Sequence, residues 1–470
     1  MGRKDLGDFQ TPRHLTDAIC KKLSIEGLKP DVLIEPTCGI GNFIVSALKY
    51  FPSLKYIYCV EIQPKYKERF YRNVYGLTRN VKIEFHCDNI FTHKFSDDFL
   101  DFLKKNNPYV LIIGNPPWAT NAEISRLGGN NVPRKINIKR FRGIDALTGK
   151  SNFDIAEYII IHVIKQFCEF KGTIAMLCKT TVARNIIKSA PILNLKIRNA
   201  RFFILNAKKE FDVNAQAGLF IADFGHEREI TCKTSSFYNS SKDIRRFGWV
   251  GSKFVSDIEK YKKYSFLDGI SPIEWRQGVK HDASKILVLK KVGNKLINGL
   301  GEYVEIEEEF LYPFVKGSKL RMPEVKKTAY MLIVTQRKPS DDTLILRKYP
   351  KLWKYLTTHA EYLDKRKSRI YRKRFSIFGI GDYAFKPYKV AISGFYKEPN
   401  FSLIHPIDGK PAMLDDTSYY LSFDSLKEAI AVWKALNSDI VKNFLSSIAF
   451  LDSKRPYTKE LLSRIDWSKL

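Results

Sequence analysis

The chain has 470 residues, 44% of them hydrophobic, and a formal net charge of +29 from 79 Lys and Arg against 50 Asp and Glu. This length favours two or three domains. So large a positive charge favours a polyanionic partner, with nucleic acid ahead of an anionic membrane surface, although a lysine-rich proteome would give the same excess.

The seven cysteines include no C-x-x-C pair, the N-terminus lacks the apolar stretch of a signal peptide, and no apolar run has membrane-spanning length. We therefore expect a cytoplasmic protein without a metal site or a disulfide framework.

Helices and strands are expected to alternate through the first half of the chain. Apolar residues recur at helical spacing in 14–28, 43–51, 65–76 and 153–168. Strand-forming residues begin or fill 31–43, 56–64, 81–91, 109–118 and 172–180, with closing strands in 201–211 and 215–224. The alternation predicts an α/β fold with a doubly wound, mostly parallel, Rossmann-like sheet. It is lost after about residue 225, so we expect two domains, 1–230 and 231–470, the second of mixed α+β type.

Four polar side chains stand at the carboxyl ends of four successive expected strands. They are Glu35, Glu61, Asp88 and Asn115. Ligands of open parallel sheets bind outside the carboxyl ends of the strands. The sequence therefore predicts a ligand site at this edge of the sheet.

The segment "EPTCGIGNF" (35–43) is a glycine turn between a strand and a helix. Gly39 and Gly41 allow a ligand to approach the backbone, but Ile44 replaces the third glycine of G-x-G-x-x-G, which disfavours a dinucleotide pyrophosphate. Glu61 can accept both hydroxyls of a ribose, and Asp88 can accept from an adenine amine. Either carboxylate can instead cap the helix that follows it.

These acceptors suit a nucleoside that carries no polyphosphate, such as S-adenosyl-L-methionine. The ammonium and sulfonium groups of that molecule are cationic. We expect Glu35 and the backbone near Asp8–Thr11 to lie close to the ammonium group.

The segment "GNPPW" (114–118) ends the fourth strand on two prolines. Pro116 and Pro117 lack an N–H and fix φ, so they stop the strand and stiffen a corner. The Asn115 amide oxygen and a backbone carbonyl, held there, can accept both hydrogens of an amine on an aromatic ring, which localises its lone pair for attack on a methyl carbon. Trp118 is expected to be exposed and to stack on that ring. The alternative is a proline-stiffened strand end with Trp118 in the core.

Six motifs in order, "DFQTP", "EPTCGIGNF", "VEIQP", "FHCDNIF", "GNPPW" and "GTIAMLCKT", resemble those of the gamma-class DNA adenine-N6 methyltransferases of restriction–modification systems. The resemblance is strong over 8–222 and looser beyond. It implies methyl transfer from S-adenosyl-L-methionine to an adenine that is flipped out of double-stranded DNA.

The resemblance also implies roles for single residues. Asn115 and the Pro116 carbonyl would hold the adenine amine, and Trp118, where the family usually has Tyr or Phe, would stack on the base. Phe211 aligns with an aromatic residue that packs on the other side of the base, although it equally suits a core position. The cofactor contacts would be Thr11, Glu35, Gly39, Gly41, Glu61, Asp88, Pro117 and Phe153.

A basic segment, 119–152, follows the corner directly and includes Arg140 and Arg142. Loops of this length in compact domains are usually functional or mobile. Its charge suits a loop that follows DNA phosphates over the substrate, or simply a solvated basic loop.

The second half resembles the target-recognition domains of the same enzymes in segments 275–287, 311–320, 354–385, 410–423 and 436–462. A basic run there interleaves with Tyr371 and Phe375, as in nucleic-acid grooves. Its residues are Lys365, Arg366, Lys367, Arg369, Arg372, Lys373 and Arg374. Helical spacing would instead distribute these charges around a solvated helix.

Other readings remain open from the sequence. An RNA base-amine methyltransferase shares the Asn-Pro-Pro-aromatic corner, a cytosine-N4 enzyme is a close variant, and protein glutamine methylation uses the same chemistry. The non-enzymatic alternative is a DNA-binding specificity protein with a decayed catalytic domain. No convincing nuclease motif is present, so we expect a protein that methylates only, with a separate cognate restriction endonuclease. We also expect the protein to act as a monomer.

Overall fold

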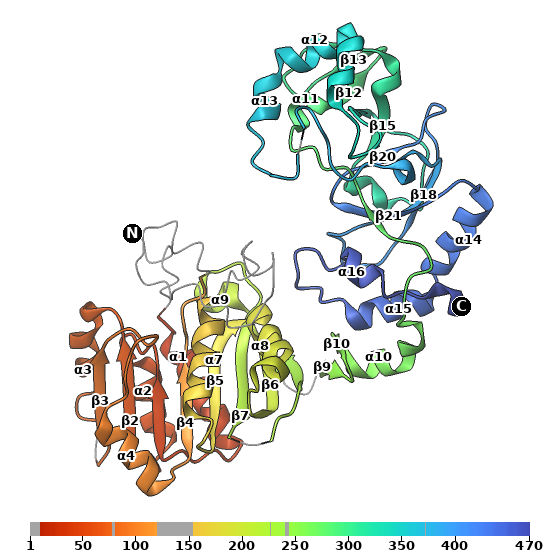
Figure 1. The fold of residues 1–470 in the computed structure, drawn as a ribbon. Helices are drawn as coiled ribbons and strands as arrows, with labels where there is room; N and C mark the ends of the chain where they lie inside the picture. The colour runs from red at the N-terminus through yellow and green to blue at the C-terminus, as the bar shows by residue number, and fades with distance from the viewer. Residues whose placement is uncertain (1–9, 78–79, 120–153, 226, 240–243, 372) are drawn as a thin grey trace. The chain divides into compact units, whose positions relative to one another are not determined.

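The computed structural model describes residues 10–77, 80–119, 154–225, 227–239, 244–371 and 373–470 (Figure 1). The chain forms two compact units, Met1–Ile258 and Glu259–Leu470. This division falls after the expected boundary at residue 230, because the strands between residues 231 and 255 pair with the sheet of the first unit. No helix in the described ranges is long and apolar enough to cross a membrane.

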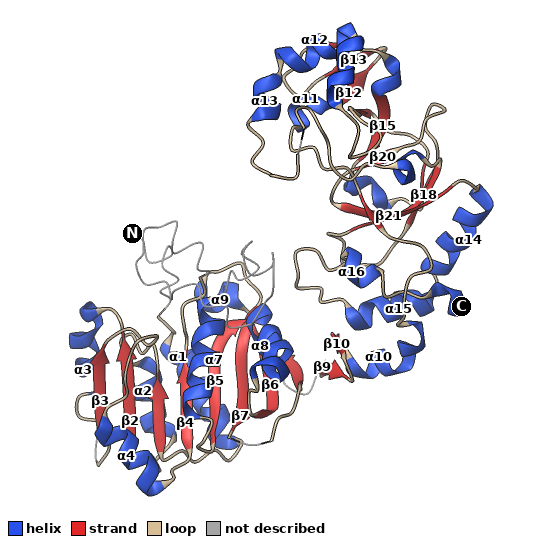
Figure 2. Ribbon diagram, viewed as in Figure 1, coloured by secondary structure: helices blue, strands red, loops and turns tan. Residues whose placement is uncertain are grey.

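One ten-stranded sheet forms the centre of the first unit (Figure 2). Its strands are β1 (Val32–Glu35), β2 (Tyr56–Glu61), β3 (Lys82–Cys87), β4 (Val110–Gly114), β5 (Gly172–Lys179), β6 (Ile197–Leu205), β7 (Ala217–Phe224), β8 (Thr231–Ser236), β9 (Arg245–Val250) and β10 (Lys253–Val255). They lie in the order β10-β9-β8-β6-β7-β5-β4-β1-β2-β3. The run from β5 to β3 is parallel, and β7 pairs antiparallel with both β5 and β6. The Rossmann-like sheet expected from the sequence is confirmed.

Helices cover both faces of this sheet. They are α1 (Arg13–Ile25), α2 (Asn42–Tyr50), α3 (Lys67–Val74), α4 (Asp97–Asn106), α7 (Ile155–Phe167), α8 (Thr180–Leu193) and α9 (Ala207–Phe211), with a 3₁₀ turn η1 (Pro64–Tyr66). Strand β2 shows the division, because Ile57 and Cys59 share a core with α1, α2 and α3, whereas Tyr56 and Tyr58 contact Phe99 of α4. Side chains alternate across a strand, so a strand that is apolar throughout is buried on both faces.

The second unit contains two smaller sheets. The first has the order β11-β21-β18-β19-β16 and the second β14-β13-β12-β17-β15-β20. Their bounds are β11 (Arg276–Gln277), β12 (Val288–Val292), β13 (Lys295–Ile297), β14 (Tyr303–Val304), β15 (Leu311–Val315), β16 (Glu324–Val325), β17 (Tyr330–Ile333), β18 (Tyr388–Ser393), β19 (Ser402–Ile404), β20 (Met413–Leu414) and β21 (Ser418–Phe423). Two apolar clusters pack against these sheets, and the smaller one joins residues of both, such as Val315 and Ala391, which gives the mixed α+β unit expected.

Short helices join these strands. The α-helices are α10 (Ile258–Tyr264), α11 (Ser284–Leu287), α12 (Pro350–Thr358), α13 (Ala360–Asp364), α14 (Leu426–Leu436), α15 (Asp439–Ile448) and α16 (Lys459–Leu462). The 3₁₀ helices are η2 (Ser265–Leu267), η3 (Glu308–Phe310), η4 (Gly317–Arg321), η5 (Thr343–Lys348), η6 (Asp382–Phe385) and η7 (Trp467–Lys469).

Candidate active site

The carboxyl ends of four neighbouring strands carry the polar side chains singled out in the sequence. The strands lie in the order β4-β1-β2-β3 and are parallel. Glu35 ends β1, Glu61 ends β2, Asp88 follows β3 and Asn115 follows β4. Parallel pairing therefore brings all four to one edge of the sheet, where such folds bind ligands.

The glycine turn is held against the segment that precedes α1. Gly39 and Gly41 have φ of 51° and 81°, in the left-handed region that favours glycine. A Cβ at Gly39 would lie 2.5 Å from the side-chain oxygen of Gln10, which accepts a hydrogen bond from the Ile40 N–H (3.2 Å). The Asn42 amide donates to the Thr11 carbonyl (2.8 Å). Thr11 and Gly39 are thus adjacent, and Gln10, which the sequence reasoning missed, joins them.

Glu61 is buried and holds this turn in place. Its Oε2 accepts from the Gly39 N–H (2.8 Å), and its Oε1 accepts from the Gln63 N–H (2.8 Å). Because both oxygens bind backbone N–H groups, the carboxylate is fixed at the end of β2.

Glu35 is a buried carboxyl group whose Oε2 has no hydrogen-bond partner among the described residues. Burial raises its pKa well above the ordinary value, and the nearby Cys59 and Glu61 add to the shift. An unpaired buried carboxylate is costly, so the fold favours the protonated form until a cation approaches. The unpaired buried oxygen of Glu35 therefore suits a cationic ligand, and S-adenosyl-L-methionine carries two cationic groups, an ammonium and a sulfonium.

Asp88 is oriented by a chain of hydrogen bonds that the sequence reasoning missed. His93 Nδ1 lies 2.8 Å from Asp88 Oδ2, and His93 Nε2 lies 2.8 Å from the Tyr58 hydroxyl, which accepts from the Ser96 N–H (3.1 Å). The hydrogen bond to His93 lowers the pKa of Asp88, so this carboxylate is ionised and can only accept. In the neutral imidazole, Nδ1 therefore carries the hydrogen and Tyr58 donates to Nε2. A histidine five residues after the strand-end Asp88 was the available signal.

The corner after β4 carries a buried indole, so the expectation that Trp118 is exposed is wrong. The side chain is 7% exposed and its Nε1–H donates to the Leu177 carbonyl (3.3 Å). Phe211, at the end of α9, packs edge-on against it with ring centroids 5.0 Å apart. The structure thus brings Phe211 to the corner, 93 residues away in sequence, and both rings belong to the core. The buried face of α9 supplies the apolar contact that holds Trp118 inward.

The chain returns to this corner after residue 153. The Ile155 N–H donates to the Ala119 carbonyl (3.0 Å), and Asp154 caps α7 by accepting from the Ala156 N–H (3.1 Å). Lys179, at the end of β5, forms an ion pair with Asp154 (2.9 Å). Asp8, the segment 120–153 with Arg140, Arg142 and Phe153, and Arg372 lie outside the described residues.

Four of the six described members of the basic run have partners within the second unit, and none of the six lies in a helix, so the solvated-helix alternative does not hold. Helix α13 ends at Asp364, and the run follows it as a loop. The Arg366 guanidinium donates to the carbonyls of Leu363, His281 and Ser376. Arg366 thus ties the loop to the fold instead of facing solvent, which argues against the predicted phosphate contact.

Three other members of the run, Lys365, Lys373 and Arg374, form hydrogen bonds or ion pairs within the unit. Lys373 donates to the Ser340 and Asp341 carbonyls (2.7 and 2.8 Å), and Arg374 pairs with Asp364 (3.0 Å). Lys365 is exposed and pairs with Glu361 (3.0 Å). Arg369 is exposed and makes no side-chain hydrogen bond or ion pair within the part of the chain that the structure describes.

Comparison with known proteins places this geometry in a family. The family model of the N-6 DNA methylases matches residues 2–187. The chain is 38% identical over 469 residues to the Type II methyltransferase M.NspV of Nostoc sp. (strain ATCC 29411 / PCC 7524), covering 98% of this chain and 96% of that protein. The chain belongs to the Type II DNA methyltransferases. The family resemblance of the six motifs is confirmed, and the methyltransferase uses S-adenosyl-L-methionine as its cofactor.

Two further proteins have a lower sequence identity to this chain. The methyltransferase is 32% identical over 118 residues to the Type II methyltransferase M.CvrRI of Paramecium bursaria Chlorella virus XZ-6E, which is 25% of this chain and 26% of that protein. The structure of the Type IIL restriction-modification enzyme MmeI in complex with DNA aligns with a TM-score of 0.54 at 13% identity. That alignment covers 97% of this chain and 63% of the MmeI chain, and it supports the fold alone.

Proposed function

We propose that the methyltransferase transfers the methyl group of S-adenosyl-L-methionine to the N6 amine of an adenine flipped out of double-stranded DNA. The observation that carries this proposal is the meeting of Glu35, Glu61, Asp88 and the Asn115 corner at one sheet edge. Acceptors for a cationic nucleoside and acceptors for a ring amine lie side by side there. The N-6 DNA methylase family model over residues 2–187 favours adenine over cytosine.

The cofactor would lie along the ends of β1, β2 and β3. S-adenosyl-L-methionine supplies an electrophilic methyl carbon on a cationic sulfonium. Glu35 would ionise to pair with the ammonium group, because its buried Oε2 gains a partner there. Glu61 would accept the ribose hydroxyls and Asp88 the adenine amine of the cofactor. The remaining contacts would come from Thr11, Gly39, Gly41, Pro117 and Phe153.

His93 would act as a positioning residue for Asp88. The imidazole donates to Asp88 Oδ2, and the Asn89 N–H donates to Oδ1 (2.7 Å), so the carboxylate cannot rotate freely. A fixed acceptor loses less side-chain entropy when the amine binds. Tyr58, buried behind His93, completes the chain from the sheet to the ligand.

Methyl transfer would occur at the corner. The Asn115 amide oxygen and the Pro116 carbonyl would accept the two hydrogens of the target amine, which raises the electron density available on its nitrogen. The cofactor would supply the methyl group and keep the electron pair of the carbon–sulfur bond, while Asn115 and the Pro116 carbonyl hold the amine nitrogen toward that carbon. The methylated amine then loses one proton to solvent, and Pro116 and Pro117 keep both acceptors in place throughout.

Base flipping would require the two corner rings to separate. A base stacked between Trp118 and Phe211 needs about 7 Å between the rings, twice the usual stacking distance of about 3.5 Å. The observed centroid separation is 5.0 Å. Phe211 lies at the end of a five-residue helix, so we expect α9 to shift when the base enters.

The second unit would recognise the target sequence, and the protein would act as a monomer beside a separate restriction endonuclease. The decisive experiment incubates the full chain with tritiated S-adenosyl-L-methionine and unmethylated genomic DNA, and then identifies the labelled nucleoside. Label in N6-methyldeoxyadenosine is the expected result. Label in N4-methyldeoxycytidine would overturn the proposed target base, and label in RNA or protein alone would overturn DNA as the substrate.

A further inference from the structure

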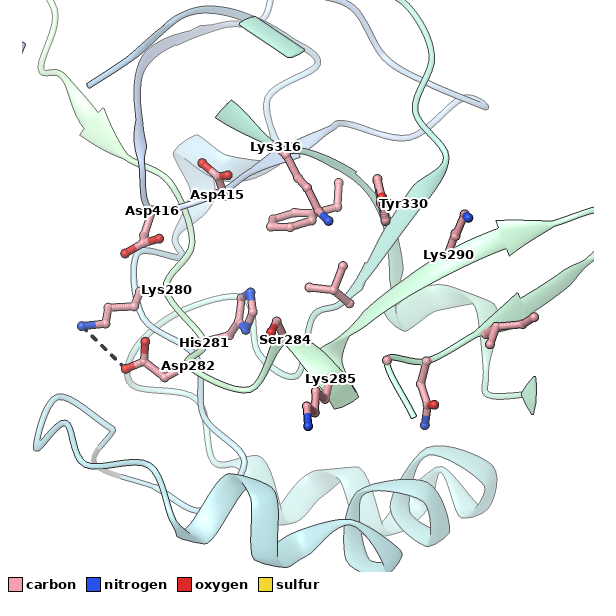
Figure 3. Close-up of a pocket in the computed structure, with 15 residues that line it drawn as sticks. Lys280, His281, Asp282, Ser284, Lys285, Lys290, Lys316, Tyr330, Asp415 and Asp416 are labelled. Atoms are coloured by element: carbon pink, nitrogen blue, oxygen red, sulfur yellow. Dashed lines mark ion pairs between the residues drawn. The ribbon is translucent and has the colours of Figure 1, made fainter. Parts of the chain in front are cut away.

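A cavity of about 720 Å³ opens in the second unit beside the basic run, because Arg366 donates to the carbonyl of His281 (3.2 Å), which lines the cavity (Figure 3). Its lining comes from the loop between β11 and α11, from β12, from the ends of β13 and β15, from β17, and from the turn after β20. The strands that line it all belong to the sheet β14-β13-β12-β17-β15-β20. The cavity carries a mixture of cationic, anionic and neutral polar side chains, which distinguishes it from an apolar core gap.

Two carboxylates, Asp282 and Asp416, form what we call the acidic wall. Their segments are joined by backbone pairing, because the Val279 N–H donates to the Leu414 carbonyl (2.7 Å). Figure 3 shows both carboxylates on the same side of the cavity. Burial raises the pKa of Asp416, and the negative charge of Asp282 is among the further causes. Lys280 pairs with Asp282 at 3.6 Å. The Asp416 carboxylate makes no hydrogen bond or ion pair with any described residue, so it is available as an acceptor.

Three lysines, Lys285, Lys290 and Lys316, form the basic wall. The side chains of Lys285 and Lys290 are exposed and take part in no hydrogen bond or ion pair within the described ranges. Lys316 lies over the ring of Tyr330, with Nζ 3.7 Å from the ring centroid. In Figure 3, Lys290 lies on the opposite side of the cavity from the acidic wall, and the Lys316 side chain lies between them.

His281, which also lines the cavity, supplies a neutral hydrogen-bond donor. The Ala283 N–H donates to His281 Nδ1 (3.2 Å), which leaves the hydrogen of the neutral ring on Nε2. Burial lowers the pKa of His281 to about 4, so the ring is neutral at physiological pH. The cavity thus offers acceptors on one side, a neutral donor, and free cations on the other.

We propose that this cavity reads the DNA target, with the acidic wall accepting from the exocyclic amine of a base and the basic wall holding adjoining phosphates. Carboxylates are selective for the amines of cytosine and adenine, whereas lysines on phosphates add affinity without sequence information. The proposal deepens the function above and rests on the second unit being the recognition unit. It assigns base reading, which the sequence left unassigned, to Asp282 and Asp416.

The first arm of the test measures specificity. A pool of random-sequence duplex DNA is methylated by the full-length protein, and methylated sites are located by single-molecule sequencing that detects both N6-methyladenine and N4-methylcytosine. The wild-type protein yields one consensus sequence. Asp416→Asn or Asp282→Asn is expected to lose discrimination at one position by about 10-fold or more while the other positions are kept. Asparagine suits residue 282, where φ is 48°.

The second arm measures affinity for a duplex that carries the consensus. Lys285→Ala combined with Lys290→Ala is expected to lower the slope of log Kd against log salt by about 2, with the consensus unchanged. Lys427→Ala is the matched control, because Lys427 is an exposed lysine of the same unit that does not line the cavity. Thermal unfolding of each variant identifies any that fails to fold.

Failure of the inference and failure of the proposed function give different results. If the wild-type protein yields a consensus, and both aspartate variants keep it while the lysine pair keeps its salt slope, the cavity does not read DNA. If the wild-type protein methylates no duplex DNA at all, the proposed function itself is wrong. Because the sequencing detects both modified bases, the arm on specificity does not depend on which base is the target.

Discussion

The two units use charged side chains in opposite ways. At the sheet edge of the first unit, three carboxylates stand at strand ends, and two of them, Glu61 and Asp88, are fixed by backbone or imidazole donors that leave them facing the site. In the second unit, cations such as Arg366 and Lys373 are bound to carbonyls inside the fold. Charges at the ends of parallel strands thus gather at one edge of the sheet, whereas a run of charges in a loop can be structural.

Substitution of Asn115, at the sheet edge of the first unit, is expected to have the largest effect. Asn115→Ala removes one of the two proposed acceptors of the target amine, so methyl transfer should fall by about 10²–10³-fold. Cofactor affinity should stay close to that of the wild-type protein, because Asn115 acts on the base. Single-turnover methylation together with calorimetric titration of S-adenosylhomocysteine separates the two quantities. A parallel loss of cofactor affinity would contradict this division of roles.

A buried lysine tests the second region. Lys389 on β18 is fully buried, donates to the Lys386 carbonyl (2.8 Å), and has its pKa lowered by burial to about 7. The unfolded chain binds that proton more tightly, so the lysine costs most stability below about pH 7 and progressively less toward about pH 10.5. Lys389→Met should raise the free energy of unfolding by about 3 kcal/mol at neutral pH. Denaturant unfolding of both proteins across this pH range should show the gain shrinking as pH rises, and a constant gain would contradict it.

Two arginines of the basic run form a matched pair. Arg366→Ala removes donors from three carbonyls and should destabilise the second unit by about 2–3 kcal/mol. Arg369→Ala should leave stability unchanged and lower the salt slope of DNA binding by about 1 at most. Urea unfolding and salt-dependent DNA titration of each variant make the comparison. Equal stability of the two variants would show that the hydrogen bonds of Arg366 do not support the unit.

The sheet and the gathering of four polar side chains at its edge could be predicted from the sequence because each depends on local patterns. Val32, Leu33 and Ile34 run directly into Glu35, and three further strands end in the same way. The order of the strands in the chain, together with parallel pairing, then brings these ends together. What was missed at this edge, Gln10, Tyr58 and His93, acts through contacts between segments that are distant in sequence.

The sequence-based expectations were wrong where contacts between distant segments determine the structure. Trp118 is drawn inward by Phe211 and by the Leu177 carbonyl, neither of which is near it in the chain. The first unit ends at Ile258 instead of residue 230, because β8 pairs with β6 and extends the first sheet. In the basic run, the spacing of the charges gave no indication that Arg366 would reach His281 across 85 residues.

Glu35 and its raised pKa give a pH-dependent prediction for the first region. A carboxyl whose pKa is raised must lose its proton to pair with an ammonium group, so cofactor binding should release a proton and weaken as pH falls. Glu35→Gln should lower cofactor affinity by about 30-fold near neutral pH and remove this dependence. Calorimetry in two buffers of different ionisation enthalpy counts the protons. Unchanged proton release in Glu35→Gln would assign the effect to another group.

The smallest effect is expected from the loss of His93, which positions Asp88. Two ligands that differ only at the adenine amine measure this effect separately from other changes. S-adenosylhomocysteine carries the adenine amine, whereas S-inosylhomocysteine has a carbonyl oxygen in its place. If Asp88 accepts from that amine, the wild-type protein prefers the first ligand and Asp88→Asn loses the preference. His93→Ala should lower the affinity for the first ligand by about 5-fold and leave the second nearly unchanged, because the imidazole acts only through Asp88.

His86→Ala is the matched control for this experiment. His86 stacks on the same Tyr58 ring, with centroids 4.5 Å apart, but its Nε2 lies 3.0 Å from Glu84 instead of Asp88. A general loosening of β2 and β3 would weaken both ligands in both histidine variants, whereas a positioning role weakens only the amine-bearing ligand and only in His93→Ala. Equal binding of the two ligands by the wild-type protein would instead show that Asp88 does not contact the adenine amine. The affinities of both ligands for the wild-type protein and the three variants therefore separate the role of the strand-end carboxylate from that of the hydrogen-bonded chain behind it.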